Sequence, residues 1–222
     1  MDKEGTRIEA YSPEWFKVRT KSFTGSELWK LMTEPRSKSE TISKTAETYI
    51  LEKVWESLSG LTKGGIDNFA TEWGNQEEPN AKKWYTHLTG RAVEESPLVY
   101  HPTFIGLIGT PDGLVGEDGL IEVKCPWNGA NHLKHCFITT GEYFKKEYND
   151  YYWQMMAYMF LTGRKWCDFV SFDPRIESDL GLFIYRLEAN EEDFVLIEDK
   201  VTKARELYEG YLISFQGEKK EV

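Results

Sequence analysis

Two acidic residues and a lysine have the types and the spacing required for metal-assisted chemistry. Asp112 lies in a Thr-Pro-Asp-Gly turn, and Glu122 and Lys124 follow in a short apolar run. Because side chains alternate along an extended strand, Glu122 and Lys124 point to one face while Val123 points to the other. If a hairpin brings Asp112 beside Glu122, the two carboxylates and the carbonyl of Val123 form an all-oxygen site suited to Mg²⁺.

Lys124 would lie beside such an ion and orient, or help to deprotonate, a water that attacks phosphorus. The same residues also have an ordinary structural interpretation. A glutamate and a lysine two apart on a strand commonly form a solvated ion pair, and Pro-Asp-Gly is a frequent turn sequence. The short motif therefore indicates phosphoryl chemistry only in combination with further residues.

Eight short blocks, in order over about residues 12–172, supply those further residues. Together they resemble the PD-(D/E)xK nuclease superfamily and, within it, the lambda-phage-type exonucleases, also called YqaJ-like viral recombinases. The blocks are Trp15 with Arg19, Thr24-Gly-Ser26, Pro35-Arg-Ser37, Trp73-Gly-Asn-Gln-Glu-Glu78, Glu95-Ser-Pro97, Pro111-Asp-Gly-Leu114, Glu122-Val-Lys-Cys-Pro126, and Tyr151 followed by Gln154.

The resemblance implies a restriction-endonuclease-like core and gives each matched residue an expected role. Asp112 and Glu122 match the metal-binding acids of the family. Val123 matches the residue that lends its backbone carbonyl to the metal, and Lys124 matches the catalytic lysine. Glu78 matches an acid that helps to hold a second metal ion.

The periodicity of the helix predicted over residues 76–88 does not by itself choose between Glu77 and Glu78. Glu77 lies nearer the centre of the predicted inner face, although both side chains are within reach of it. The choice of Glu78 follows from the resemblance, and the alternative is a solvated acid favoured by the helix dipole. The predicted inner face consists of Ala81, Trp84, Tyr85 and Leu88.

Arg19, Ser26, Thr110 and Gln154 match positions that hold the 5′-phosphate of the DNA end in the lambda-type enzymes. Ser26 falls in the first turn of a predicted helix, where free N–H groups favour an anion, and Arg19 adds a bidentate contact. Thr110 departs from the more usual serine by one methyl group. The alternatives are a surface ion pair for Arg19 and simple helix capping for Ser26.

The rest of the sequence predicts the elements that position these side chains. Their order of helices, meander, helix, strands and helix indicates the α/β class, as an α+β sandwich around one mixed sheet flanked by helices. Helical periodicity predicts helices over residues 28–32, 41–58, 76–88, 151–161 and 191–211. Short apolar runs between turn residues predict strands over residues 97–100, 104–109, 114–115, 120–125, 166–172 and 182–187.

Several local features refine this prediction. Residues 24–27 have capping-box spacing, and Pro79 is expected within the first turn of its helix, where its missing N–H has no partner to lose. Aromatic residues and methionines are interleaved over residues 148–161, which predicts core packing in preference to base stacking. The four histidines lack consistent metal-ligand spacing and are predicted to lie at the surface or in loops.

The composition limits the class of protein. A chain of 222 residues, 40% of them hydrophobic, predicts a single domain over residues 1–222. Residues 1–9 are polar and no long apolar run follows, so we expect neither a secretory signal nor a membrane span, and a cytoplasmic location. Three cysteines without CxxC spacing predict free thiols. The net charge of −10 argues against a broad basic surface for nucleic acid, but not against a local metal site.

The residues and the resemblance together predict a Mg²⁺-dependent exonuclease with two bound ions, for which Mn²⁺ is a possible substitute. It would degrade one strand of linear double-stranded DNA from a 5′-phosphorylated end in the 5′-to-3′ direction and leave a 3′ single strand. The resemblance further implies a ring-shaped homotrimer, a single-strand annealing protein as partner in recombination, and a phage or prophage origin. The alternatives are an endonuclease of the same fold, a catalytically silent DNA-end-binding module, and an interaction scaffold whose carboxylates are surface charge.

Overall fold

The computed structural model describes residue 8 and residues 12–37, 41–62 and 69–217. The expectation about a signal segment over residues 1–9 therefore lies outside the described residues, apart from Ile8. The α-helices are α1 (Pro13–Arg19), α2 (Lys44–Ser59), α3 (Phe69–Thr89), α4 (Gly129–His135), α5 (Gly141–Glu147), α6 (Asn149–Thr162) and α7 (Glu191–Gly217), and the 3₁₀ helices are η1 (Gly25–Lys30) and η2 (Asp179–Gly181).

The strands form two hydrogen-bonded sheets. One sheet has the order β1-β4-β3 and the other has the order β2-β5-β6-β7-β8. Each is mixed, because β1 pairs with β4 and β6 pairs with β7 in parallel while the other neighbours are antiparallel. The strands are β1 (Phe23–Thr24), β2 (Val93–Glu94), β3 (Val99–Tyr100), β4 (Leu107–Gly109), β5 (Gly113–Val115), β6 (Gly119–Lys124), β7 (Trp166–Phe172) and β8 (Leu182–Glu188).

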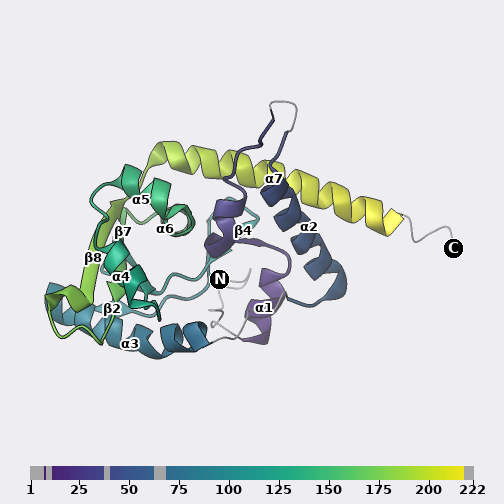
Figure 1. Ribbon diagram of the computed structural model, residues 1–222. Helices are drawn as coiled ribbons and strands as arrows, with labels where there is room; N and C mark the ends of the chain where they lie inside the picture. The colour runs from purple at the N-terminus through teal and green to yellow at the C-terminus, as the bar shows by residue number, and fades with distance from the viewer. Residues whose placement is uncertain (1–7, 9–11, 38–40, 63–68, 218–222) are drawn as a thin grey trace.

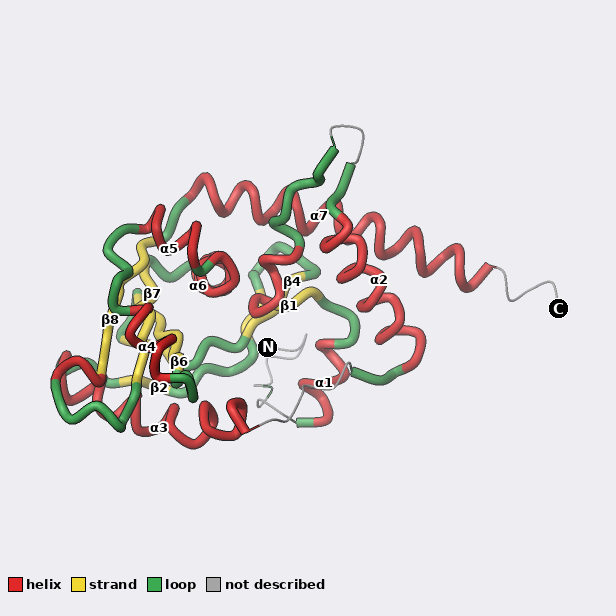
Figure 2. The backbone as a smooth tube through the Cα atoms, viewed as in Figure 1, coloured by secondary structure: helices red, strands yellow, loops and turns green. Residues whose placement is uncertain are grey.

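The helices surround these sheets. Figure 1 shows α7 along one edge of the molecule and α3 along the opposite edge, with the last turns of α7 extending beyond the other elements. In Figure 2 the strands β6, β7 and β8 gather on the side away from α2, whereas β1 and β4 lie nearer to it. Helix α6 packs against η1, β4 and α7 and supplies much of the core, since its residues 152–161 are all buried. The predicted core packing of this aromatic and methionine-rich segment is thus confirmed.

The predicted α+β class and most of the longer elements are confirmed. The prediction of one mixed sheet is wrong, because the strands form two sheets. The chain passes from one sheet to the other between β4 and β5, at the Thr110-Pro-Asp112 segment. Pro111 has no N–H to donate, so the ladder does not continue through it. Two of the candidate site residues, Thr110 and Asp112, lie in this break.

Three local predictions about helices are wrong. Helix α3 begins at Phe69, so Pro79 lies in its interior and not in its first turn. Its inner face is narrower than predicted, because Trp84 is 56% exposed and Leu88 is 65% exposed. The predicted capping box gives a 3₁₀ helix in which the Thr24 side chain makes no capping hydrogen bond.

The prediction that the histidines lie at the surface or in loops is wrong for two of them. His132 and His135 lie on α4 and are buried. The hydroxyl of Ser171 on β7 contacts the Nδ1 atoms of both, at 2.9 Å and 2.7 Å. The carbonyl of Leu180 accepts a hydrogen bond from His132 Nε2. These partners satisfy the polar ring atoms that burial would otherwise leave unpaired.

The cysteines agree with the sequence-based prediction, because Cys125, Cys136 and Cys167 are all free. In the part of the chain that the structure describes, no helix has both the length and the apolar character needed to cross a membrane.

Candidate active site

A β-hairpin places Asp112 beside Glu122. Strands β5 and β6 pair antiparallel with Gly113 opposite Ile121. Asp112 and Glu122 are the next residues on the two sides, so they lie across from each other at the open end of the hairpin. The backbone N–H of Val123 donates a hydrogen bond of 2.7 Å to Asp112 Oδ2. This bond fixes the turn residue onto the strand that carries the second acid, as the hairpin hypothesis requires.

The predicted site residues all line one cavity of about 610 Å³, although they come from five separate parts of the chain. It opens between the hairpin, α3, α6 and the segment that joins α1 to η1. The predicted residues in its lining are Arg19, Ser26, Glu78, Thr110, Asp112, Glu122, Val123, Lys124 and Gln154.

We call the part of the cavity that contains Asp112, Glu122 and Lys124 the metal end. Glu122 and Lys124 form its centre. Glu122 is 1% exposed, and its Oε1 accepts a hydrogen bond of 2.5 Å from Lys124 Nζ. Among the described residues, Glu122 Oε2 is buried and has no hydrogen-bond partner. The Lys124 ammonium also lies 4.9 Å from the ring centroid of Tyr151.

The electrostatics of the metal end disfavour two bare carboxylates. Burial raises the pKa of the Asp112 carboxyl well above its usual range, and the charge on Glu122 raises it further. Burial also raises the pKa of Glu122, although Lys124 acts in the opposite direction. For Lys124, burial alone would lower the pKa, but the charges of Glu122 and Asp112 outweigh it and raise the pKa above its ordinary value.

The donors present fit a hard divalent cation. Asp112 and Glu122 offer carboxylate oxygens as metal ligands. A bound cation would also give the buried Glu122 Oε2 a partner, which it lacks among the described residues. No group of three His, Cys, Asp or Glu residues positioned to hold a metal occurs among the described residues. Mg²⁺ suits such a site, because it usually keeps several waters and needs only one or two protein carboxylates beside substrate phosphates.

Glu78 lines the cavity, whereas Glu77 does not. Glu78 on α3 forms an ion pair with Lys82, one turn later on the same helix, with 2.7 Å between Glu78 Oε1 and Lys82 Nζ. Lys82 also lies 3.5 Å from Glu95. Burial alone would lower the pKa of Lys82, but its hydrogen bond to Glu78 and the nearby acids raise it. The acid expected to help a second metal ion is therefore paired with a lysine in this structure.

The other end of the cavity, which we call the phosphate end, consists of Arg19, Ser26, Thr110 and Gln154. The guanidinium carbon of Arg19 lies 4.2 Å from the ring centroid of Trp15. The indole N–H of Trp15 donates a hydrogen bond of 3.1 Å to Thr110 Oγ1. Trp15 thus contacts two of the predicted phosphate ligands and fixes their relative positions.

Tyr158 of α6 packs against the segments that form the phosphate end. Its hydroxyl accepts a hydrogen bond of 3.0 Å from Gln154 Nε2. Gly25 and Gly109 both lie against its ring, and a Cβ atom at either glycine would be 2.6 Å from a ring carbon. The absence of side chains at these two positions therefore allows η1 and β4 to approach α6 closely.

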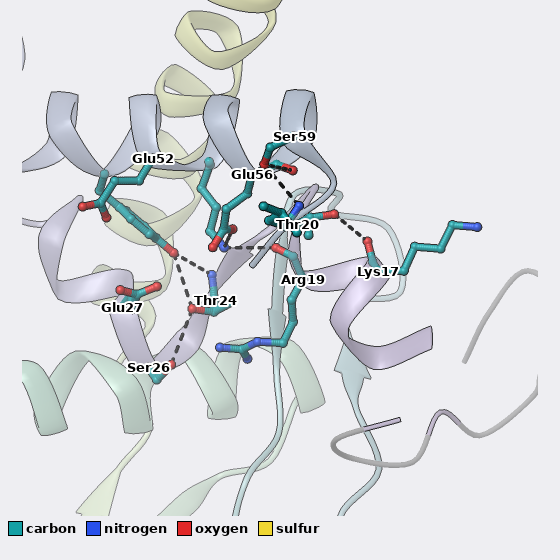
Figure 3. A network of polar contacts seen from close by, with 12 residues as sticks. Lys17, Arg19, Thr20, Thr24, Ser26, Glu27, Glu52, Glu56 and Ser59 are labelled. Carbon is teal, nitrogen blue, oxygen red and sulfur yellow. Dashed lines mark hydrogen bonds and ion pairs between the residues drawn. The ribbon is translucent and has the colours of Figure 1, made fainter. Parts of the chain in front are cut away.

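Helix α2 holds the segment that carries Arg19 and Ser26, as Figure 3 shows. The buried Lys53 donates a hydrogen bond of 3.0 Å to the carbonyl of Arg19 and forms an ion pair of 2.7 Å with Glu56. Figure 3 also shows the Arg19 side chain extending toward Ser26, while Lys17 extends the opposite way.

A tyrosine hydroxyl on the same helix orders the start of η1. The backbone N–H of Thr24 donates a hydrogen bond of 3.1 Å to the Tyr49 hydroxyl. The Thr24 hydroxyl lies 3.4 Å from this oxygen and 3.5 Å from the Ser26 hydroxyl. Tyr49 is 1% exposed, so this chain of polar contacts has little access to competing water.

Sequence reasoning missed several residues that shape the cavity. Lys82 follows Glu78 at the i, i+4 spacing of a helical ion pair, which is a readable signal. Tyr158 appeared only as a core residue, and Tyr151 appeared in one of the matched blocks without an assigned role, although both line the cavity. The roles of Lys53 and Tyr49 depend on contacts 34 and 25 residues away in the sequence, which no short motif encodes.

Solved structures resemble the chain over nearly its whole length, whereas no curated protein was found to match it. The alkaline exonuclease LHK-Exo from Laribacter hongkongensis is 32% identical, with a TM-score of 0.79 over 93% of this chain and 97% of that chain. Its complex with dAMP matches over the same shares, with 33% identity and the same TM-score of 0.79. A phage-related exonuclease from Haemophilus somnus 129PT has the same fold, with 22% identity and a TM-score of 0.73 over 87% of this chain and 96% of that chain.

The fold expected from the resemblance is therefore confirmed. The model of the YqaJ-like viral recombinase domain matches residues 14–165, which include the residues of both ends of the cavity. On this match and on the identity with the alkaline exonuclease, the chain belongs to the YqaJ-like viral recombinase domain family.

Proposed function

We propose that the protein is a Mg²⁺-dependent exonuclease that degrades one strand of linear double-stranded DNA in the 5′-to-3′ direction from a 5′-phosphorylated end. The observation that carries the proposal is the convergence of Asp112, Glu122 and Lys124 at one end of a cavity, with Glu122 Oε2 buried and unpartnered among the described residues. The family match and the likeness to an alkaline exonuclease support it.

In this proposal the residues at the metal end have different roles. Asp112, Glu122 and the carbonyl of Val123 would hold Mg²⁺, and Glu78 is the proposed ligand for a second ion. Mg²⁺ held there would supply stabilisation of negative charge on the phosphoryl oxygens and activation of water as a nucleophile. Lys124 carries a positive charge beside Glu122, from which it orients the attacking water and stabilises the charge that develops on the phosphate.

In this proposal the phosphate end determines the 5′-to-3′ direction of degradation. Arg19, Ser26, Thr110 and Gln154 would bind the terminal 5′-phosphate, with the Arg19 guanidinium giving the charge-assisted contacts. A strand held by its 5′ end presents its first phosphodiester to the other end of the cavity. Successive cleavage from that end leaves a 3′ single strand.

The family resemblance supports a wider proposal about assembly. The single exonuclease domain would form a ring-shaped homotrimer around DNA and would act with a single-strand annealing protein, in the cytoplasm of the bacterial host of a phage. A solution mass equal to one chain at micromolar concentration would contradict the trimer. Mn²⁺ is expected to substitute for Mg²⁺, because both favour oxygen ligands.

The proposal is tested with purified full-length protein and linear duplexes that carry either 5′-phosphate or 5′-hydroxyl ends. With Mg²⁺ we expect release of nucleotides from the phosphorylated strand, and with a chelator none. Lys124→Ala should abolish turnover and retain most DNA binding, since the lysine acts in the chemical step. Lys165→Ala is the matched control, because Lys165 is an exposed lysine immediately before the neighbouring strand β7. Metal-independent release, or full activity of Lys124→Ala, would refute the proposed chemistry.

The same assay separates the alternatives. An endonuclease would cut a closed circular duplex, which the proposed exonuclease leaves intact. A silent end-binding module would bind the phosphorylated duplex and release no nucleotide with either Mg²⁺ or Mn²⁺. Equal digestion of the two kinds of end would refute the phosphate end alone and leave the metal end unaffected.

A further inference from the structure

An aromatic cluster lies where the first turns of α3 meet the loop after β6. It consists of Phe69, Trp73 and Trp127. The ring centroids of Phe69 and Trp127 are 4.5 Å apart, and those of Trp73 and Trp127 are 5.1 Å apart, both pairs in edge-to-face geometry. Two of the rings are nevertheless open to solvent, because Phe69 is 59% exposed and Trp127 is 43% exposed.

Arg175 holds this cluster in place. Its guanidinium carbon lies 5.0 Å from the ring centroids of both Trp73 and Trp127. Its Nη2 donates a hydrogen bond of 2.9 Å to the carbonyl of Trp127, and the buried Asp173 accepts two hydrogen bonds from the same guanidinium. Trp127 is therefore fixed through both its ring and its backbone while part of its surface stays free.

The cluster adjoins the candidate active site on two sides. Thr71 and Gly74 of α3 line the cavity, and they flank Trp73 in the sequence. Pro126 also lines the cavity, and it immediately precedes Trp127. Trp127 also follows Lys124 by three residues, so the exposed rings adjoin the metal end of the cavity.

From this geometry we propose that Phe69, Trp73 and Trp127 form a stacking platform for unpaired nucleobases of the DNA strand at the edge of the active site. The inference rests on the proposed nuclease function, which supplies the occupant. Every base has a π-face, so aromatic stacking binds single strands with little dependence on sequence, and the guanidinium of Arg175 adds a positive group behind the rings. A fixed ring stacks at low entropic cost, since its side chain is already ordered before the base arrives.

The test uses full-length protein with chelator, so that binding is measured without hydrolysis. The probe is a 5′-phosphorylated duplex with a short single-stranded tail that contains 2-aminopurine, whose fluorescence falls when it stacks. We expect Trp127→Leu to weaken binding of the tailed duplex about tenfold and to abolish the extra quenching. Trp127→Phe should retain most of both, because an aromatic face remains.

Trp84→Leu is the matched control. Trp84 lies on the same helix, is 56% exposed, and does not line the candidate active-site cavity. Binding and quenching by this variant should equal those of the wild type. A second variant, Phe69→Ser, tests the platform if Trp127→Leu has a lowered melting temperature, and it should lose part of the quenching with unchanged stability.

Two results would overturn the platform: wild-type binding and quenching by both Trp127→Leu and Phe69→Ser, or an equal loss by Trp84→Leu. Its failure is distinguishable from failure of the proposed function. Nucleotide release by the wild type with Mg²⁺, together with unaltered binding by the platform variants, would refute the platform alone. Quenching by the wild type without any nucleotide release would refute the nuclease alone.

Discussion

The metal end and the phosphate end of the cavity are built in opposite ways. Asp112, Glu122 and Lys124 come from one hairpin, and burial disfavours the negative charges of the two acids even with Lys124 beside them. Arg19, Ser26, Thr110 and Gln154 come from four separate segments, and neighbours such as Trp15, Tyr158 and Lys53 already bond or contact some of them. One end is compact in sequence but electrostatically unfavourable until a cation binds, whereas the other is dispersed in sequence but already organised.

This difference indicates how each end should respond to change. At the metal end, substitutions should alter chemistry and metal binding more than folding, because the charged groups are stabilised poorly without the ion. At the phosphate end, substitutions should alter recognition and stability together, because the ligands share hydrogen bonds with the core. The following predictions test that contrast.

Of the substitutions that compare the two ends, Asp112→Asn should have the largest effect. It removes a carboxylate ligand and should lower nucleotide release by about three orders of magnitude, as loss of a principal electrostatic group does in other enzymes. The control is Asp118→Asn in the turn of the same hairpin, where the acid side chain is 53% exposed and pairs with Lys165. Mg²⁺ should raise the melting temperature of Asp118→Asn but not that of Asp112→Asn. Full activity of Asp112→Asn would remove the basis for the metal end.

The second prediction concerns pH. The raised pKa values of Asp112 and Glu122 mean that these carboxyls hold protons in the metal-free protein at pH values where unfolded chains have lost them. They therefore stabilise the metal-free fold at low pH, and this contribution is lost as the pH rises through their folded pKa values. Mg²⁺ requires the deprotonated form, so its affinity should fall about tenfold per pH unit for each proton displaced below those values.

The measurement is the difference in melting temperature with and without Mg²⁺. This difference should increase as the pH rises above the ordinary carboxyl range of about 4. The dependence should be absent in Asp112→Asn. A constant difference from acid to neutral pH would show that the carboxyl protons do not compete with the ion.

Arg19→Gln should act on recognition. Removing the guanidinium should reduce the preference for a 5′-phosphate over a 5′-hydroxyl about tenfold, because hydrogen bonds to charged groups contribute about 1.5–3 kcal/mol. Cleavage of the hydroxyl end should change little. Lys17→Gln is the control, since Lys17 lies on the same helix, is exposed, and points away from the cavity in Figure 3. An unchanged preference in Arg19→Gln would contradict the assignment of the phosphate end.

The smallest effect is expected from Tyr49→Phe. It leaves the Thr24 N–H buried without its acceptor and should lower the free energy of unfolding by about 1–3 kcal/mol. The preference for the phosphate should fall slightly, because Ser26 is connected to Tyr49 through Thr24. Tyr143→Phe on α5 provides a control at an exposed tyrosine. Unaltered stability of Tyr49→Phe would indicate that the Tyr49 hydroxyl does not order η1.

The contrast between the two ends also explains what the sequence revealed. The metal end was predictable from alternation along one strand, because its residues lie within thirteen positions, from 112 to 124, of the same hairpin. The phosphate end was found only through resemblance, since no local pattern relates Arg19 to Gln154. Glu78 shows the limit most clearly: periodicity placed Glu77 nearer the inner face, because it assumed that Trp84 and Leu88 were buried.

Part of the missed secondary structure did have local signals. Helix α1 begins with Ser12 as N-cap and Pro13 in its first turn, and α4 and α5 are capped by the side chains of Asn128 and Thr140. The division into two sheets has no single local signal, because the chain changes sheet between β1 and β2, between β2 and β3, and between β4 and β5, and Pro111 lies only in the last of these connections. The burial of His132 and His135 depends on Ser171 and Leu180, which lie more than thirty residues away.

The two glycines against Tyr158 have a consequence for variation of this protein. A methyl group at Gly25 or Gly109 would overlap a ring that lies beneath both the arginine-bearing and the acid-bearing segments. In a saturation library, these two codons should therefore tolerate almost no replacement, although neither glycine has a functional group. Directed evolution of the enzyme would have to change the tyrosine first, before either backbone position became free to vary.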